Sequence, residues 1–279
     1  VGKHINEKWI LLYIERWIKV SYEKVDGERT VRNQGVPQGS VIGPVLANLF
    51  LHYGFDKWMT IKHPSILFER YADDTICHCR TEEEAKKLLE SVRARLRECK
   101  LELNEEKTKI VYCKTSRRKI NYPNVMFDFL GFTFRPRRAI DKRHGESFTS
   151  FLPAISKKSA QEVRDKIKAW DLYRFQQFKL PVIAKMKNPI IAGWVNYYGK
   201  FGRTEFLKVM NYLNKTIARW AKKKFKGLKV GKGRSIYWLA DVAQQPRLAP
   251  EGCDVLRRLE CPEDIVRSDC GAAAAAGID

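Results

Sequence analysis

The sequence predicts an α+β domain that is followed by an all-α domain. The first half alternates amphipathic helical patterns with short β-like runs, whereas residues 156–226 are largely helical in pattern. Mixed elements followed by a run of helices are typical of two joined domains of these classes. The composition changes near residues 145–151. We therefore divide the chain into residues 1–148, residues 149–240 and an unassigned tail over residues 241–279.

The first predicted elements are a helix, a hairpin and a second helix. Residues 7–20 place large apolar side chains at helical spacing. Asp26-Gly27 is typical of a hairpin turn between two short strands. A glycine-rich loop over residues 35–43 then leads into a helix, and Pro44 is tolerated in the first turn of such a helix.

The next predicted elements surround an adjacent pair of aspartates. The runs ILFER and TICHC, residues 66–70 and 75–79, indicate two short strands. Thr81 is a good N-cap for a helix over residues 81–103, because Glu84 follows three residues later and acidic residues crowd the first turn. Further strands are predicted at residues 107–113 and 127–136.

The charge of the chain favours a polyanionic partner. The 279 residues contain 53 Lys and Arg against 32 Asp and Glu, which gives a net charge of +21. The stretch from Lys200 to Arg234 is strongly basic, with Glu205 as its single acid, and it is interleaved with aromatic residues. Basic and aromatic side chains together suit the phosphates and bases of nucleic acid better than a membrane surface. We therefore expect a nucleic-acid partner and no membrane partner.

The cysteines and the start of the sequence favour a cytoplasmic protein. Seven cysteines are present, and their spacing fits neither a paired CxxC zinc site nor a compact disulfide framework. Reduced cysteines of a cytosolic protein explain them best. No apolar run has the length of a membrane span, and the first residues are not a signal sequence.

Asp73 and Asp74 most need a physical explanation. Consecutive side chains of a strand point to opposite faces, whereas at a hairpin turn both carboxylates can lie at one exposed tip. Adjacent carboxylates repel each other, and a divalent cation would relieve that repulsion. A pair of Mg²⁺ ions held by oxygen ligands can activate a hydroxyl and stabilise a leaving oxygen in phosphoryl transfer. The same dipeptide is also common in ordinary turns, so the residues alone leave both interpretations open.

Four ordered motifs resemble those of reverse transcriptases. RYADDTICHC resembles the YxDD motif, and NQGVPQGSVIGPVLANLFL is similar to the PQG-containing motif that precedes it. LNEEKTKIVYC and FDFLGFTFRPR are similar to the two motifs that follow, in the same order. Together with IAGWVNYYGKF, they resemble the reverse transcriptase/maturase of bacterial group II introns over roughly residues 1–240.

The resemblance implies a fold and a set of site residues. The fold is a right-hand polymerase palm, an antiparallel sheet with packed helices, followed by an all-α thumb or maturase module. Asp73 and Asp74 would be ligands of two Mg²⁺ ions, and Lys107 or Lys109 would neutralise or protonate the departing pyrophosphate. The residue types also have ordinary explanations. Lys107 and Lys109 could be solvated lysines, the glycines before the predicted helix could form a flexible loop, and residues 129–131 could pack in the core. The implied substrate-binding residues are Pro37, Gln38, Gly39 and Tyr71 for nucleotide and template, and Phe129, Leu130 and Gly131 for the primer end.

The implied activity is RNA-directed DNA polymerisation. Its partners would be an RNA template, a DNA primer, deoxynucleoside triphosphates and, for the maturase role, group II intron RNA. A non-enzymatic splicing cofactor that binds intron RNA is the alternative. A diversity-generating or defence-associated reverse transcriptase is a third hypothesis. The resemblance of residues 190–201 to the maturase argues against it.

The sequence departs from the family pattern at both ends. The family takes a third catalytic carboxylate from a strand that would precede residue 1, and Asp26 and Asp56 lie outside the matching motifs. Most of the fingers domain is also missing, so we expect a catalytically incomplete fragment. Residues 241–279 match nothing assignable and contain no Cys/His nuclease signature. We expect that tail to be disordered, with weak helicity at most in its alanine run.

Overall fold

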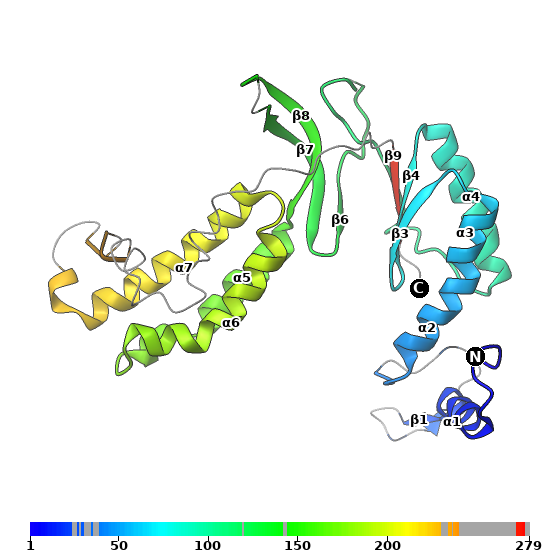
Figure 1. Cartoon of the computed structure of the whole chain (residues 1–279), viewed down its shortest axis with the longest axis horizontal. Helices are drawn as coiled ribbons and strands as arrows, with labels where there is room; N and C mark the ends of the chain where they lie inside the picture. The colour runs from blue at the N-terminus through cyan, green and yellow to red at the C-terminus, as the bar shows by residue number, and fades with distance from the viewer. Residues whose placement is uncertain are drawn as a thin grey trace. The chain divides into compact units, whose positions relative to one another are not determined.

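A computed structural model describes residues 1–23, 27, 29–30, 35, 39–118, 120–141, 144–229, 234–235, 237–239 and 272–276. The chain divides into two compact units (Figure 1). The first unit comprises residues 1–110 with residues 271–279, and the second comprises residues 111–270. The predicted domain boundary near residue 148 lies inside the second unit. The division of the chain into a palm and a thumb at that residue stays a prediction. The elements confirm a mixed α+β protein with antiparallel sheets.

The first unit begins with helical and hairpin elements at the predicted places. Gly27 has φ +85° between the two strands of the first hairpin, as the Asp-Gly turn predicts, whereas Asp26 lies outside the described residues. Its elements are α1 (Lys8–Lys19), β1 (Tyr22–Glu23), β2 (Arg29–Thr30), α2 (Gly43–Leu51), the π-helical turn η1 (His52–Asp56), α3 (Lys57–Lys62), β3 (Leu67–Tyr71), β4 (Asp74–Cys79), α4 (Glu82–Glu98), β5 (Lys109–Val111) and β9 (Ala272–Ala276).

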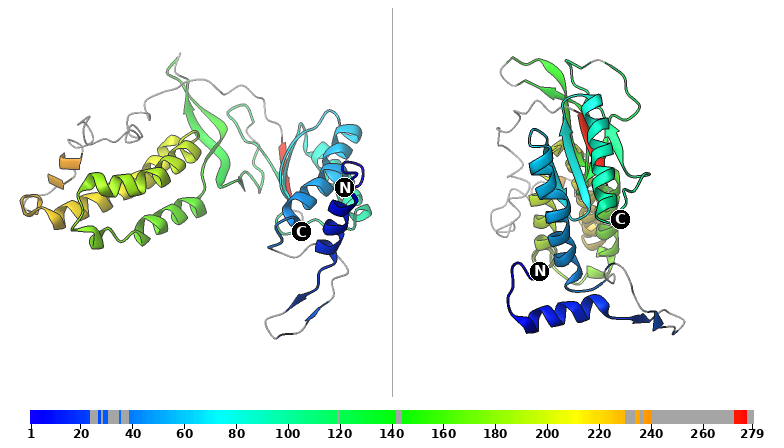
Figure 2. Two further views of the ribbon diagram at one scale, coloured as in Figure 1. Left: turned by 60° about the horizontal axis from the view of Figure 1, so that its bottom comes forward. Right: turned by 90° about the vertical axis from the view of Figure 1, so that its right-hand side faces the viewer.

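The sheet of the first unit has the strand order β3-β4-β9-β5. Strands β3 and β4 form an antiparallel hairpin in which Tyr71 lies opposite Asp74, and this confirms the two predicted strands. The helices α3 and α4 cover one face of this sheet (Figure 2). Phe55, Met59, Cys77 and Leu88 are buried together between the helices and the sheet. That core fixes β4, and therefore the end of the hairpin, on a packed support.

The alanine run at residues 272–276 corrects our expectation of a disordered tail. These residues form strand β9, which pairs antiparallel with β4 from Cys79↔Ala272 to Thr75↔Ala276. The pairing has a physical reason, because β4 is a buried strand whose backbone groups need partners on both edges. Residues 241–270 and 277–279 lie outside the described residues.

The helix after the hairpin begins as predicted and ends earlier. The Thr81 hydroxyl accepts a hydrogen bond from Glu84 N at 3.1 Å, which confirms Thr81 as the N-cap. The predicted helix ran to residue 103, whereas α4 ends at Glu98. Lys100 takes φ +58° and Leu101 N donates to Leu96 O, so the chain closes the helix with a left-handed residue.

The second unit contains a three-stranded sheet and a helical group. The strand order is β6-β7-β8, and α5, α6 and α7 share a core that includes Val163, Trp194 and Phe206. Residues 149–155, which we place at the start of the helical domain, instead belong to β8 and pair with β7. Pro153 obscured this strand in the sequence, but proline is tolerated because β8 lies at the sheet edge. The elements are β6 (Phe127–Phe129), β7 (Phe132–Ile140), β8 (Ser147–Ile155), α5 (Lys157–Ala169), the 3-10 turn η2 (Leu172–Phe175), α6 (Leu180–Tyr198), α7 (Arg203–Lys224) and the 3-10 turn η3 (Lys226–Leu228).

Within the described part of the chain, no helix combines the length and the apolar character that a membrane crossing requires.

Candidate active site and nucleic-acid surface

The turn between β3 and β4 brings two carboxylates to one exposed tip. Tyr71 pairs with Asp74, so only Ala72 and Asp73 lie in the connection between the strands. Both Asp73 and Asp74 are exposed, whereas the four residues that follow Asp74 are buried or half-buried. The hairpin therefore explains how adjacent aspartates occur in a sequence that otherwise forms strands.

Asp73 lies close enough to Asp74 to affect the ionisation of the Asp74 carboxyl group. Burial raises the pKa of Asp74, the negative charge of Asp73 raises it further, and the charge of Lys107 acts in the opposite direction. Lys107 of the predicted site is thus near the aspartate pair, while Lys109 is an exposed residue of β5. Two repelling acids at the tip are thus within the influence of the positive charge of Lys107.

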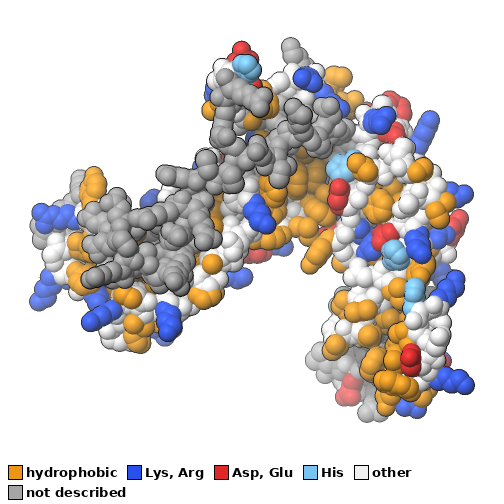
Figure 3. Space-filling view, in the orientation of Figure 1, with side chains coloured by type: hydrophobic (Ala, Val, Ile, Leu, Met, Phe, Trp, Pro, Cys, Tyr) orange, Lys and Arg blue, Asp and Glu red, His pale blue; other side chains and the backbone are white. Residues whose placement is uncertain are grey.

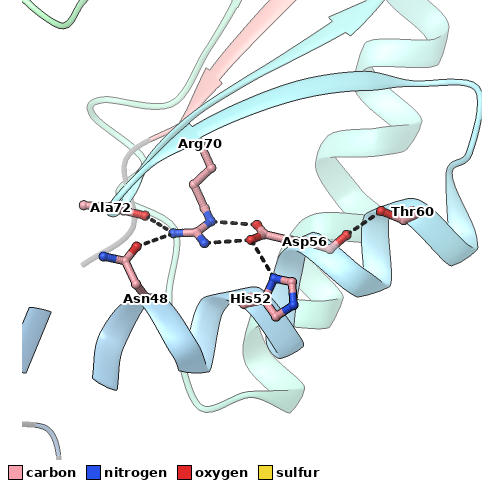
Figure 4. Close-up of polar contacts among 6 residues, drawn as sticks. All are labelled: Asn48, His52, Asp56, Thr60, Arg70 and Ala72. Carbon is pink, nitrogen blue, oxygen red and sulfur yellow. Dashed lines mark hydrogen bonds and ion pairs between the residues drawn. The ribbon is translucent and has the colours of Figure 1, made fainter. Parts of the chain in front are cut away.

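A third feature of the tip is the guanidinium group of Arg70, one residue before the end of β3 (Figure 4). Arg70 Nε and Nη2 each donate to one oxygen of Asp56 at 2.7 Å. Arg70 Nη1 donates to Ala72 O at 2.7 Å and to Asn48 Oδ1 at 2.9 Å. The turn backbone is therefore bonded through Arg70 to the α2–η1 helix.

Asp56 takes part in this ion pair and is not an additional member of the aspartate tip. Its pKa is lowered overall, because hydrogen bonds and charge from Arg70, with a contribution from His52, outweigh the opposite effect of burial. In the described portion of the chain, no group of three or more His, Cys, Asp and Glu residues could hold a metal ion. The donors at the tip are thus the oxygens of Asp73 and Asp74, a set that suits Mg²⁺ when substrate phosphates and water complete the coordination.

The glycine-rich loop is described only in part. Gly39 has φ +86°, and a side chain there would meet no atom within 4 Å, so its backbone is open to close approach. Pro37 and Gln38 lie outside the described residues. Tyr71 is 63% exposed beside the aspartate tip, so its ring is accessible to a ligand.

The turn between β6 and β7 is held by a helix of the same unit. Leu130 has φ +48°, and Leu130 O accepts a hydrogen bond from Tyr197 Oη of α6 at 2.8 Å. A Cβ atom on Gly131 would lie 2.9 Å from Ser159 Oγ and 3.1 Å from Tyr198 Oη, so this position requires glycine. Phe129 precedes the turn in β6. The packing explanation of this segment is therefore supported by direct contacts.

The helical group presents cations on α7. Lys215, Arg219 and Lys222 recur at the spacing of one helical face, and we call these three residues the α7 stripe. Lys and Arg side chains are numerous around the end of α7 in the space-filling view (Figure 3). Arg219 also borders a groove of about 680 Å³, whose lining includes Lys168, Tyr173 and Tyr212 as well as the acidic Asp165 and Asp171. Cations beside aromatic rings are the components that bind phosphates and stack on bases.

Comparison with protein families decides the relationship of the chain. Residues 3–134 match the family model described as reverse transcriptase (RNA-dependent DNA polymerase), and residues 160–238 match the group II intron, maturase-specific domain. The chain belongs to the group II intron reverse transcriptase/maturase family. No curated protein and no solved structure matches it.

The two matches divide the candidate site of this reverse transcriptase/maturase. The reverse transcriptase match contains the aspartate tip, Lys107 and the β6–β7 turn, whereas the maturase-specific match contains the α7 stripe. Tyr197 lies in the maturase-specific match and Leu130 in the reverse transcriptase match, so their hydrogen bond joins the two family domains.

Sequence reasoning missed the contacts of Arg70. The motifs leave Asp56 as an acid outside them and indicate no role for Asn48 or His52. The only available signal was a long cationic side chain directly before the Tyr-Ala-Asp-Asp sequence. Its partners lie 14 and 22 residues away, on helical elements, and no spacing rule connects them.

Proposed function

We propose that this chain is an RNA-directed DNA polymerase that also binds group II intron RNA as a maturase. The observation that carries the proposal is the tip at which Asp73 and Asp74 lie together within the electrostatic influence of Lys107, inside a reverse transcriptase match. In this proposal the β3–β4–β9–β5 sheet with its helices is the palm, and α5, α6 and α7 form the thumb.

Asp73 and Asp74 would hold Mg²⁺ together with the phosphates of the incoming deoxynucleoside triphosphate. Bound Mg²⁺, as a pair of ions, supplies activation of the primer 3′-hydroxyl and stabilisation of the leaving oxygen. Burial raises the pKa of Asp74, and repulsion from Asp73 raises it further. The repulsion supports this assignment, because a cation is the ligand that would relieve it.

The other predicted residues would bind and orient the substrates. Lys107 would neutralise charge on the departing pyrophosphate, and Tyr71 and Gly39, with Pro37 and Gln38, would contact nucleotide and template. The primer end would be bound by the β6–β7 turn, residues 129–131. The α7 stripe would follow the phosphates and 2′-hydroxyl groups of the template–primer duplex or of folded intron RNA.

A second candidate function is intron RNA binding without polymerisation. One observation favours it: within the described residues the aspartate tip has two carboxylates and no third acidic, histidine or cysteine ligand. The basic surface of the maturase-specific domain would then be the functional part of the chain.

Primer extension and RNA binding separate the two functions. We expect Mg²⁺-dependent extension of a DNA primer on an RNA template by the full chain, and its loss in the D73A/D74A variant, while RNA affinity is retained. RNA binding without extension by the unmodified chain would support the second function instead. Loss of RNA affinity in D73A/D74A would contradict the separation of the acidic tip from the basic surface.

A further inference from the structure

We infer that Arg70 is a positioning residue for the Asp73–Asp74 pair, which it orients by bonding the turn backbone to the α2–η1 helix. The inference rests on the proposed function, because it concerns the carboxylates that would hold the metal. It assigns a role to Arg70, Asp56 and Asn48, none of which is among the site residues that the resemblance implies.

The contacts of Arg70 are nearly saturated. Its side chain is 9% exposed and donates four hydrogen bonds, to both oxygens of Asp56, to Asn48 Oδ1 and to Ala72 O. A guanidinium group offers five N–H donors in a rigid plane. One side chain can therefore fix the Ala72 carbonyl relative to two residues of the neighbouring helix (Figure 4).

The support on the helix side is rigid and unusual. Asp56 is the last residue of the π-helical turn η1, and its carboxylate also lies 3.4 Å from His52 Nδ1. Its neighbour Phe55 is 1% exposed in the core of the unit, so the turn cannot shift without disturbing that core. Single π-helical turns are often associated with functional sites, because they redirect a side chain that a regular helix would place elsewhere.

The turn on the other side requires such a support. Ala72 has φ +54°, a left-handed conformation that is unfavourable for a residue with a Cβ atom. The next residue begins the aspartate pair, whose repulsion favours separation of the two carboxylates. The bond from Arg70 to Ala72 O opposes both tendencies at the residue before Asp73.

The role of Arg70 is geometric, since its charge is balanced nearby. The guanidinium group is paired with the Asp56 carboxylate, so the ion pair as a whole carries no net charge toward the tip. A lysine would keep the positive charge, but its single ammonium group cannot reproduce a planar set of four bonds. The R70K variant therefore tests geometry with the charge retained.

Binding of Mn²⁺ to the full chain, measured from the electron paramagnetic resonance signal of the free ion, tests this role without requiring activity. We expect R70K to weaken Mn²⁺ binding about 10-fold, the scale seen when residues that orient metal ligands are replaced. The matched control is R93K on α4, because Arg93 also donates four hydrogen bonds, three to the carboxylate of Glu105 and one to Glu90. We expect R93K to bind Mn²⁺ as the unmodified chain does.

The outcomes distinguish the two proposals. Binding that D73N abolishes but that R70K leaves unchanged, with both variants folded by circular dichroism, would refute the role of Arg70 alone. Absence of any Asp73-dependent binding in the unmodified chain would refute the proposed metal site and with it this role. If R70K does not fold, N48A removes one acceptor at an exposed position and should still weaken Mn²⁺ binding several-fold; unchanged binding would overturn the inference.

Discussion

Asp73 and Asp74 show how a functional requirement opposes stability at single residues. The pKa of Asp74 is raised by burial and by the charge of Asp73. A carboxyl group with a raised pKa binds more protons in the folded state than in the unfolded state, so its contribution to stability falls as the pH rises through that range. At neutral pH the charged pair therefore destabilises the hairpin when no cation is bound.

D73N should raise the melting temperature of the chain slightly at pH 7 in the absence of divalent cations. The substitution removes one cause of the raised Asp74 pKa, and the gain should disappear near pH 3, where the carboxyl groups are largely protonated (~3.9 for an ordinary Asp). Thermal unfolding followed by circular dichroism at both pH values provides the measurement. D165N is the control, because Asp165 is an exposed residue that accepts from the neutral Gln161 amide. A D73N variant that is less stable at pH 7 would contradict this electrostatic account.

The residues of the candidate site differ in how far sequence could predict them. Asp73 and Asp74 are adjacent in the chain, so a turn between two β-like runs was enough to predict one exposed tip, which the hairpin confirms. The bonds of Arg70 depend on how a helix packs against a strand, and that packing has no local sequence signal. The metal and substrate roles of the predicted residues stay predictions.

At the scale of elements, the helices were predicted best and the weakly patterned strands worst. Helical spacing of apolar residues correctly indicated α1, α4, α5, α6 and α7. Strand β8 contains Pro153 and lacks clear alternation of buried and exposed residues, and β9 consists of alanines. Both strands are defined by their pairing partners, which lie elsewhere in the chain.

The contact between β8 and the start of α7 depends on a glycine. A Cβ atom on Gly202 would lie 2.1 Å from Ala154 Cβ, and Gly202 also has φ +55°. We expect G202A to destabilise the second unit by about 3 kcal/mol, because it combines overpacking with backbone strain. Urea unfolding followed by tryptophan fluorescence would measure the change.

Gly193 provides the matched control for that substitution. It lies inside α6, and a Cβ atom there would meet nothing within 4 Å. G193A should therefore be neutral or stabilise the chain by up to about 1 kcal/mol, through helix propensity. Equal effects of G202A and G193A would contradict the close approach of α7 to β8.

At the scale of the whole molecule, charge is the dominant property. A net charge of +21 favours association with any polyanion, so the strength of RNA binding alone says little about which surface is used. The dependence on salt is more informative, because each phosphate contact contributes a fixed increment to the slope.

Alanine substitution of the α7 stripe should lower the salt dependence of RNA binding. If Lys215, Arg219 and Lys222 each contact a phosphate, the slope of log K against log salt should fall in magnitude by about 2 to 3. Fluorescence anisotropy of a labelled RNA over a series of KCl concentrations measures that slope. The control is K19A/K86A, whose ammonium groups pair with Glu15 and Glu82. A slope that changes equally in the control would indicate a general charge effect in place of contacts by the stripe.

The sheet of the second unit has a consequence for whether the two matched domains can be separated. The reverse transcriptase match ends at residue 134 and the maturase-specific match begins at residue 160, yet β7 and β8 pair continuously between Phe132↔Ile155 and Ile140↔Ser147. Physical separation of the two matched segments would divide this sheet and leave an unpaired strand edge. The hydrogen bond from Tyr197 to Leu130 would be lost by the same separation. Although the two domains are separate families, in this chain the β7–β8 sheet and the bond from Tyr197 to Leu130 join them structurally.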